Sequence, residues 1–225
     1  RDLSVDWTGK FSQLLADKHS ASVGWELQQN RRSETKSTLN DGKQDESDVD
    51  FGNTFTARIA RAALYAQDEW EWSRQLSFYT GLRWEGITTT GDTNVGHVVN
   101  RSSVLTPLGH LVWKFDGDDG KPGRDQLRAS LTRSYRSPNT NQLIGRRQIS
   151  PLAPLGAGNP PSTADRPDRE GNPALKPELA WGLELGLEHY LASGGLTSAN
   201  LFLRRISNVI RNVTSSQAVP VDYAD

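Results

Sequence analysis

The fold of this chain is decided by residues 179–191, which read Leu-Ala-Trp-Gly-Leu-Glu-Leu-Gly-Leu-Glu-His-Tyr-Leu. Every second position from Leu179 to Leu187 carries leucine or tryptophan, while the positions between them carry alanine, glycine or glutamate. Successive side chains of a strand point to opposite faces, whereas a helix would mix these two sets. The stretch therefore predicts a long β-strand with one large apolar face and one small or charged face.

The same alternation returns in residues 76–85, where the second face carries Arg83 and Glu85, and more weakly along most of the chain. Because each of these patterns has a period of two, the chain is expected to be all-β. Eight strands are predicted, near residues 3–14, 21–27, 55–72, 76–85, 105–115, 127–131, 179–191 and 199–203.

The predicted connections alternate between short and long. Short links fall near residues 16–18, 73–75, 116–124 and 192–195, and long polar links fall near residues 31–53, 91–101 and 137–177. In an antiparallel up-and-down order, all the short links then lie at one end of the strands. Tight periplasmic turns and extended extracellular loops are typical of outer-membrane β-barrels.

The composition of the two faces favours a barrel wall with lipid outside and water inside. In the two clearest strands the apolar face carries no Lys, Arg, Asp or Glu, although charged residues form 24% of the chain. A Lys or Arg facing lipid at mid-bilayer costs about 2–4 kcal/mol, so lipid would select such a face. A membrane helix needs an apolar run of about 18 residues, which is absent here, but a barrel strand does not. The residues expected to face lipid are Leu76, Phe78, Leu82, Trp84, Leu183, Leu185 and Leu187.

Charge and residue types limit the other functions. The chain has 26 basic and 27 acidic side chains, and this balance argues against nucleic acid as a partner. It has no cysteine, and its four histidines do not show the spacing of metal ligands. Neither a metal site nor a cofactor is expected, and the sequence contains no catalytic motif, so an enzyme is not expected.

A proline-rich motif leads into the strand that decides the fold. Residues 172–178 read Asn-Pro-Ala-Leu-Lys-Pro-Glu, and the two prolines keep this segment stiff and extended. Further matching segments lie before and after this motif, at residues 64–70, 81–85, 135–138 and 201–208, and their order along the chain is the one expected for one family. Together they resemble the TonB-dependent outer-membrane receptors. The role expected for the motif is structural, and it rests on Asn172, Pro173, Leu175, Lys176, Pro177 and Glu178.

This resemblance implies the architecture of a much larger protein. Such receptors have a transmembrane barrel of about 22 strands, which follows an N-terminal plug. Residues 1–225 are then expected to be part of the barrel domain, with the plug and the closing strands outside this sequence. The resemblance places the chain in the bacterial outer membrane, in contact with lipid and lipopolysaccharide. The TonB energy-coupling complex would act through the missing N-terminal part.

The resemblance also implies import of a scarce nutrient, with a ferric siderophore or a similar iron complex as the favoured ligand. Because many such ligands are anionic, arginine and aromatic groups of the outer loops are the natural binding groups. The residues expected to bind ligand are Tyr135, Arg136, Asn139, Arg146 and Arg147. Two alternatives stay open: a self-contained small outer-membrane barrel that serves as an adhesin or structural protein, and a soluble β-sandwich that binds a ligand.

Overall fold

The computed structural model describes most of the chain. The described residues are 2–16, 18–35, 39–40, 43–44, 54–93, 96–116, 122–143, 150, 152–153, 160–191 and 194–216. None of the helical residues in these ranges forms a segment with the length and apolar character that crossing a bilayer requires.

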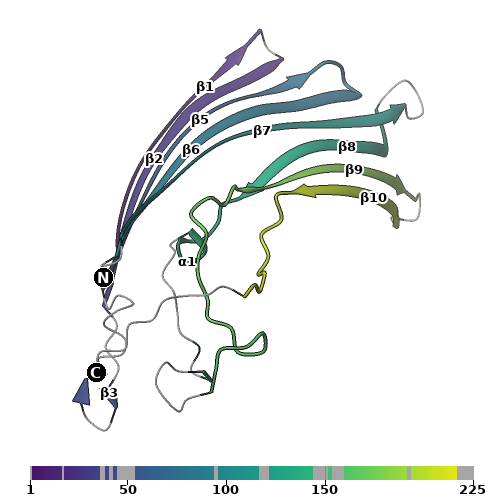
Figure 1. Ribbon diagram of the computed structural model, residues 1–225. Coiled ribbons are helices and arrows are strands. Elements are labelled where there is room, and N and C mark those ends of the chain that lie inside the picture. The colour runs from purple at the N-terminus through teal and green to yellow at the C-terminus, as the bar shows by residue number, and fades with distance from the viewer. Residues whose placement is uncertain are drawn as a thin grey trace.

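Eight long strands make up one sheet, and each of the eight predicted strands corresponds to one of them. Their bounds are β1 (Asp2–Leu15), β2 (His19–Thr35), β5 (Thr54–Glu71), β6 (Leu76–Thr93), β7 (Gly96–Asp116), β8 (Pro122–Arg136), β9 (Glu178–Tyr190) and β10 (Leu196–Ser207). The order in the sheet is the order in the chain, and every neighbouring pair is antiparallel. Figure 1 shows that the sheet is strongly curved and remains open between β1 and β10. The all-β, up-and-down fold is therefore confirmed.

Three short elements were not expected from the sequence. A two-stranded hairpin, β3 (Leu39–Asn40) with β4 (Lys43–Gln44), lies between β2 and β5. A single helical turn, α1 (Thr140–Leu143), follows β8. All three belong to the links at one end of the strands (Figure 1).

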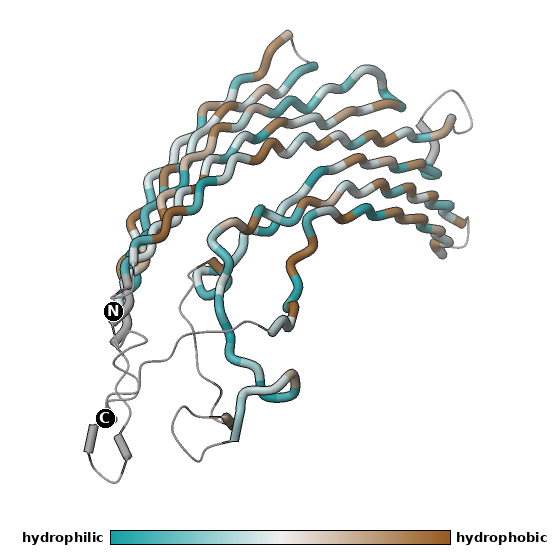
Figure 2. Tube along the Cα trace, in the orientation of Figure 1, coloured by the Kyte–Doolittle hydropathy of each residue, from teal (hydrophilic) through white to brown (hydrophobic). Residues whose placement is uncertain are grey.

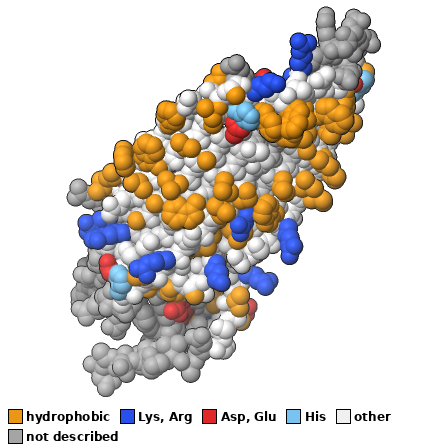
Figure 3. All heavy atoms as spheres, turned by 90° about the horizontal axis from the view of Figure 1, so that it is seen from above, with side chains coloured by type: hydrophobic (Ala, Val, Ile, Leu, Met, Phe, Trp, Pro, Cys, Tyr) orange, Lys and Arg blue, Asp and Glu red, His pale blue; other side chains and the backbone are white. Residues whose placement is uncertain are grey.

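The register places most of the leucine and tryptophan residues of the eight strands on the same face. Trp25, Leu64, Trp84 and Leu105 lie directly opposite one another on β2, β5, β6 and β7. In Figure 2 the trace of each strand alternates between apolar and polar residues, and Figure 3 shows that the apolar side chains gather on the convex face. A single curved sheet with this asymmetry has the form of a barrel wall.

All seven residues expected to face lipid share the register of the convex face. Leu82 is 47% exposed and Leu183 is 38% exposed, so neither is covered by a second sheet. Phe78 packs beside Trp70 and Trp72 on the same face, with ring centroids 5.8 and 6.4 Å away. Contact of these residues with lipid stays a prediction.

One of the three long loops expected from the sequence is wrong. Instead of a loop at residues 91–101, β6 continues to Thr93 and β7 begins at Gly96, and the two strands pair to their ends. Within residues 91–101, Val98 and Val99 favour strand because they are β-branched, but polar residues and glycines surround them, and the absence of apolar alternation predicts a loop. The loop expected at residues 31–53 begins later, because β2 continues to Thr35. The loop at residues 137–177 has the expected bounds.

Backbone pairing between β7 and β8 is interrupted toward the loop end of the described strands, and we call this interruption the seam. Pairing between β7 and β8 runs from Leu108 to Asp116, near the short turns, whereas among the described strands residues 96–107 of β7 pair with β6 alone. Figure 1 shows β8 leaving β7 toward the loop end. The loop between β8 and β9 passes over the concave face there, where Leu143 of α1 packs against Ala57 and Leu175. The concave face is thus partly covered at its loop end.

Candidate ligand-binding site on the concave face

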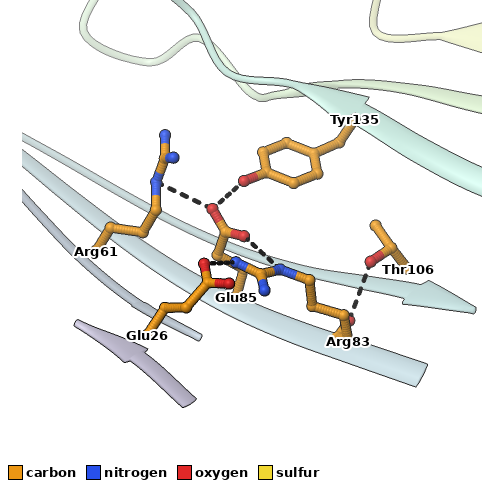
Figure 4. Close-up of polar contacts among 6 residues, drawn as sticks. All are labelled: Glu26, Arg61, Arg83, Glu85, Thr106 and Tyr135. Atoms are coloured by element: carbon orange, nitrogen blue, oxygen red, sulfur yellow. Dashed lines mark hydrogen bonds and ion pairs between the residues drawn. The ribbon is translucent and has the colours of Figure 1, made fainter. Parts of the chain in front are cut away.

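A network of charged side chains lies on the concave face where the seam opens (Figure 4). Its centre is Glu85 of β6, whose side chain is only 4% exposed. Glu85 Oε1 lies 3.0 Å from Arg61 Nε, and Glu85 Oε2 accepts a hydrogen bond of 3.0 Å from Arg83 Nε. Arg83 Nη2 also donates to Glu26 Oε2 at 2.6 Å. Two cations and two anions thus balance one another across β2, β5 and β6.

Tyr135 joins this network from the far side of the seam. Its hydroxyl donates a hydrogen bond to Glu85 Oε1, although backbone pairing between β7 and β8 has already stopped at Leu108. A buried carboxylate is tolerated only when it has hydrogen-bonding and charged partners, and Glu85 has two hydrogen bonds, from Arg83 and Tyr135, and an ion pair with Arg61. The network therefore fixes the position of β8 relative to β6 through side chains.

An aromatic contact supports the same arginine. The ring of Tyr65 lies 6.0 Å from the guanidinium carbon of Arg83, in a cation–π geometry. The ring occupies the space over Gly24, where an added Cβ atom would overlap it. A glycine on β2 therefore lets the tyrosine of β5 lie flat along the wall and support Arg83.

The proline-rich motif lies beside β7. The side-chain amide of Asn100 donates to the carbonyl oxygens of Pro173 at 2.7 Å and Leu175 at 3.0 Å. Asn172 begins the segment with an Asx turn, because its Oδ1 accepts from Ala174 N at 2.9 Å. Asn100 thus holds the motif against the part of β7 that β8 does not pair.

The end of the motif is held by the segment after β10. Asn208 Nδ2 donates to the carbonyl oxygen of Pro177 at 3.2 Å, and Ile210 N donates to Glu178 Oε1 at 2.7 Å. Lys176 is exposed, and Pro177 is buried. These contacts support the structural role expected for the motif, which stays a prediction.

The five residues expected to bind ligand do not form one cluster in the described part of the chain. Tyr135 belongs to the network, whereas Arg136 forms an ion pair of 2.8 Å with Glu178 and its side chain is 68% exposed. Asn139 Oδ1 accepts from Gln142 N at 2.8 Å in the first turn of α1. Arg146 and Arg147 lie outside the described residues. Ligand contact by all five stays a prediction.

Sequence reasoning missed most of the network because it searched the loops. Arg83 and Glu85 were assigned to the polar face of their strand, but neither was chosen as a site residue. The signal that could have identified them was the polar face of the strand, because charged side chains are favourable on a face that borders water. Asn100 carried no signal, because its role depends on a segment more than 70 residues away.

A curved antiparallel sheet with an apolar convex face and a charged concave face defines the wall of a large up-and-down β-barrel. The family described as TonB dependent receptor-like, beta-barrel matches residues 1–224 of the chain. The chain belongs to this family, whose members are transport receptors of the outer membrane and not enzymes. Among curated proteins, no match was found.

Solved structures of siderophore receptors share this fold. The alcaligin outer-membrane receptor FauA from Bordetella pertussis is 17% identical, with 91% of this chain and 28% of FauA covered and a TM-score of 0.52. The ferric-catecholate import receptor Fiu from E. coli K12 is 14% identical, with 91% and 31% covered and a TM-score of 0.57. The siderophore receptor PiuA from Acinetobacter baumannii is 13% identical, with 89% and 31% covered and a TM-score of 0.52. The chain thus spans less than a third of these receptors.

Proposed function

We propose that this chain forms part of the barrel wall of a bacterial outer-membrane receptor that binds a ferric siderophore or a similar iron complex and imports it. The observation that carries the proposal is the charged concave face with the loop of residues 137–177 folded over it, in a chain that belongs to a family of transport receptors. In this scheme the convex face contacts outer-membrane lipid and lipopolysaccharide. The TonB energy-coupling complex acts through a part of the receptor outside this sequence.

The proposed ligand site lies at the mouth of the wall, between the network and the loop. Arg136 is its main cation, because it is exposed and its pairing with Glu178 can be exchanged for an anionic ligand. Tyr135 supplies an aromatic face while its hydroxyl remains bound to Glu85. Asn139 supplies polar contacts from the start of α1, and Arg146 and Arg147 are proposed to add charge from the same loop.

The rival interpretations fit the structure less well. A self-contained barrel of eight strands requires β1 to pair with β10, and the described strands show no such pairing. A β-sandwich requires a second sheet against the apolar face, where Leu183 and Leu185 are 38% and 37% exposed. The structure therefore favours part of a larger wall.

Uptake of iron by cells tests the proposal. A strain that lacks its own siderophore receptors and expresses the full-length receptor is given radioactive iron bound to a panel of catecholate, hydroxamate and carboxylate siderophores. At least one complex is expected to enter the cells in a TonB-dependent manner. Absence of uptake for the whole panel, with the receptor folded in the outer membrane, would contradict the proposal.

The contribution of Arg136 is tested in the same assay. Replacing Arg136 by Gln is expected to raise the KM for uptake about tenfold, because a charge-assisted contact contributes about 1.5–3 kcal/mol. The control is Arg128→Gln, since Arg128 is also an exposed arginine of the concave face and pairs with Glu188 at 3.3 Å near the short turns. Equal KM values for the two variants would exclude Arg136 from the ligand site.

A further inference from the structure

The backbone groups of β7 alternate between its two neighbours. Lys114 N donates to the carbonyl oxygen of Gln75 at 2.8 Å, on the β6 side of the strand. The carbonyl oxygen of Leu105 instead accepts a hydrogen bond of 3.1 Å from Nη1 of Arg133, which belongs to β8. The N–H and C=O of one strand residue point to the same side, and the side changes at each residue. Even-numbered residues of β7 therefore bond to β6, and odd-numbered residues point to the seam.

A proline marks the start of the seam. Backbone pairing between β7 and β8 runs as far as Leu108 with Thr132, and the next residue of β7 is Pro107. Its odd number places the missing N–H of Pro107 on the side of β8, so that the ladder lacks a donor there, while pairing with β6 continues. The seam is therefore a property of the β7 sequence.

Three residues beyond Pro107 present unpaired backbone groups to the seam, and we call them the acceptor edge: Val99, Arg101 and Ser103. Within the described part of the chain, no strand pairs with β7 on this side of the three residues. A row of unpaired N–H and C=O groups is a template for a further strand. The acceptor edge can therefore bind an extended chain through its backbone.

A groove lies along the acceptor edge. It has a volume of about 490 Å³, and residues 99–104 of β7 and residues 173–177 of the motif line it. The motif touches β7 through the side chain of Asn100, which binds the carbonyl oxygens of Pro173 and Leu175. The two prolines of the motif have no N–H to offer to β7. The motif thus borders the acceptor edge without pairing with it.

The length of β7 places the acceptor edge outside the hydrocarbon. β7 has 21 residues, whereas a tilted barrel strand crosses a bilayer with about 9–11 residues. On the convex face Leu105, Leu111 and Trp113 are apolar, but Ser103 and Arg101 beyond them are polar. In an outer-membrane barrel the long loops lie outside the cell, and the acceptor edge lies in the loop-side half of β7. An extracellular polypeptide can therefore reach it through water.

The charged groups around the groove are basic. Its described lining includes Arg101 and Lys176 and no acid. Arg133 lies at the start of the seam, and its Nε is buried and has no hydrogen-bond partner in the described structure. An acidic side chain opposite Arg101 would form a favourable cross-strand pair, whereas a basic one would be repelled. The opposite face of an added strand would meet Val104 and Leu175, which also line the groove.

We propose that the acceptor edge binds an extended acidic segment of an extracellular protein, which adds to β7 as an antiparallel strand. The backbone of the acceptor edge supplies the hydrogen bonds, and the basic and apolar linings of the groove select alternate side chains. The inference rests on the outer-membrane orientation in the proposed function, but not on import of an iron complex. The added strand would continue the ladder that stops at Leu108.

Peptide binding to the full-length receptor tests this proposal. The probe is a fluorescent peptide of about ten residues with alternating valine and glutamate, the length of a long strand. Its binding to the receptor in mild detergent is measured by fluorescence anisotropy. One control peptide has lysine in place of glutamate, and the other carries N-methyl groups on its glutamates. The glutamates would lie opposite the acceptor edge and supply the hydrogen bonds, so the acidic peptide is expected to bind at least about tenfold more tightly than either control.

Substitutions in β7 locate the bound peptide. Val99→Pro removes one N–H of the acceptor edge, as Pro107 already does further along, and should weaken binding of the acidic peptide about fivefold or more. Val99→Thr keeps this N–H and should change binding less than about twofold. Arg101→Gln should also weaken binding about fivefold, because one charge-assisted contact is lost. Arg58→Gln removes the same charge from the same face two strands away and should have less than about a twofold effect.

Heat-dependent mobility on gels shows that each variant is folded. If Val99→Pro does not fold, the N-methylated peptide tests the same hydrogen bonds on the unchanged receptor. Absence of binding by the acidic peptide would overturn the proposal, as would equal binding of the N-methylated peptide. Binding that is unchanged in both Val99→Pro and Arg101→Gln would overturn it too. No iron complex is present in this titration, so failure of peptide binding and failure of iron uptake can be told apart.

Discussion

At the scale of single residues, Glu85 organises the concave face. Its two carboxylate oxygens contact Arg61, Arg83 and Tyr135, which come from three different strands. A carboxylate that is almost completely buried is stable only while its partners remain. The same residue joins the two sides of the seam, because Tyr135 reaches it from β8.

Replacing Glu85 by Gln should lower the free energy of unfolding of the full-length receptor by about 1–3 kcal/mol, because both arginines lose a charged partner in a buried site. The measurement is urea unfolding in lipid vesicles, followed by tryptophan fluorescence. Glu184→Gln serves as the control, since Glu184 is 62% exposed and lies 4.0 Å from Arg204. Its effect should be about 0.5 kcal/mol or less. A loss of stability no larger for Glu85→Gln than for the control would contradict the buried network.

Replacing Gly24 by Ala should displace the ring of Tyr65, which lies over the glycine, and weaken its contact with Arg83. The expected cost is about 1–3 kcal/mol, the usual range for overpacking. Gly109→Ala is the matched control, because a Cβ atom at Gly109 would have no neighbour within 4 Å. The same urea unfolding assay compares the two variants. Equal urea midpoints for Gly24→Ala and Gly109→Ala would show that the ring of Tyr65 can move aside without loss of stability.

At the scale of the strands, alternation of side chains predicts six of the eight members of the sheet, whereas residues 3–14 and 55–72 read as strands without an apolar face that the sequence can assign. It works where one face is apolar and the other polar, as in Leu183 to Leu187, because lipid and water select different residues. It fails at residues 91–101, where β6 and β7 extend although neither face is consistently apolar. The seam was equally beyond reach, since pairing partners cannot be read from one strand.

Replacing Leu183 by Arg should cost about 2–4 kcal/mol if the middle of β9 faces hydrocarbon. The comparison is Glu184→Gln, which raises the charge by the same amount on the opposite face and should have little effect. The readout is the fraction of full-length receptor that assembles in outer membranes, measured by heat-dependent mobility on gels. Similar assembly of both variants would mean that the convex face does not meet lipid.

At the scale of the whole molecule, the sheet has two free edges. Among the strands that the structure describes, β1 and β10 each pair with one neighbour, and β10 exposes apolar side chains such as Leu201 at 57%. Free edges and a broad apolar face both promote association between chains. In the proposed receptor, of which the chain would span less than a third as it does of FauA and Fiu, the remaining strands would cover these edges.

The 225-residue chain expressed alone is therefore expected to aggregate in mild detergent, whereas the full-length receptor should remain monodisperse. Analytical ultracentrifugation in the same detergent compares the two proteins at equal concentration. A monomeric 225-residue chain with strand content near that of the sheet described above would show that its edges need no partner.

The sequence was more informative about the wall than about the site. Family membership, the order of strands and the apolar face follow from local patterns, and these are confirmed. The network of Glu26, Arg61, Arg83, Glu85 and Tyr135 could not be predicted, because it depends on the register of four strands, β2, β5, β6 and β8, and on the point where β8 separates from β7. The five loop residues that the sequence predicts as ligand-binding have side chains suited to an anionic ligand. Their spacing in the sequence, however, does not determine where they lie in the folded chain.

The early end of the β7 and β8 ladder has a mechanical consequence. Tension applied to the loop of residues 137–177 cannot spread from β8 to β7 along a row of backbone hydrogen bonds in that half of the wall, although β8 stays paired with β9 as far as Arg136. Across the seam it passes instead through side chains, namely the hydroxyl of Tyr135 on Glu85, the amide of Asn100 on the motif carbonyls and the guanidinium of Arg133 on the carbonyl of Leu105. Movement of this loop would therefore load these side-chain contacts, whereas the half of β7 and β8 near the short turns is held by backbone hydrogen bonds.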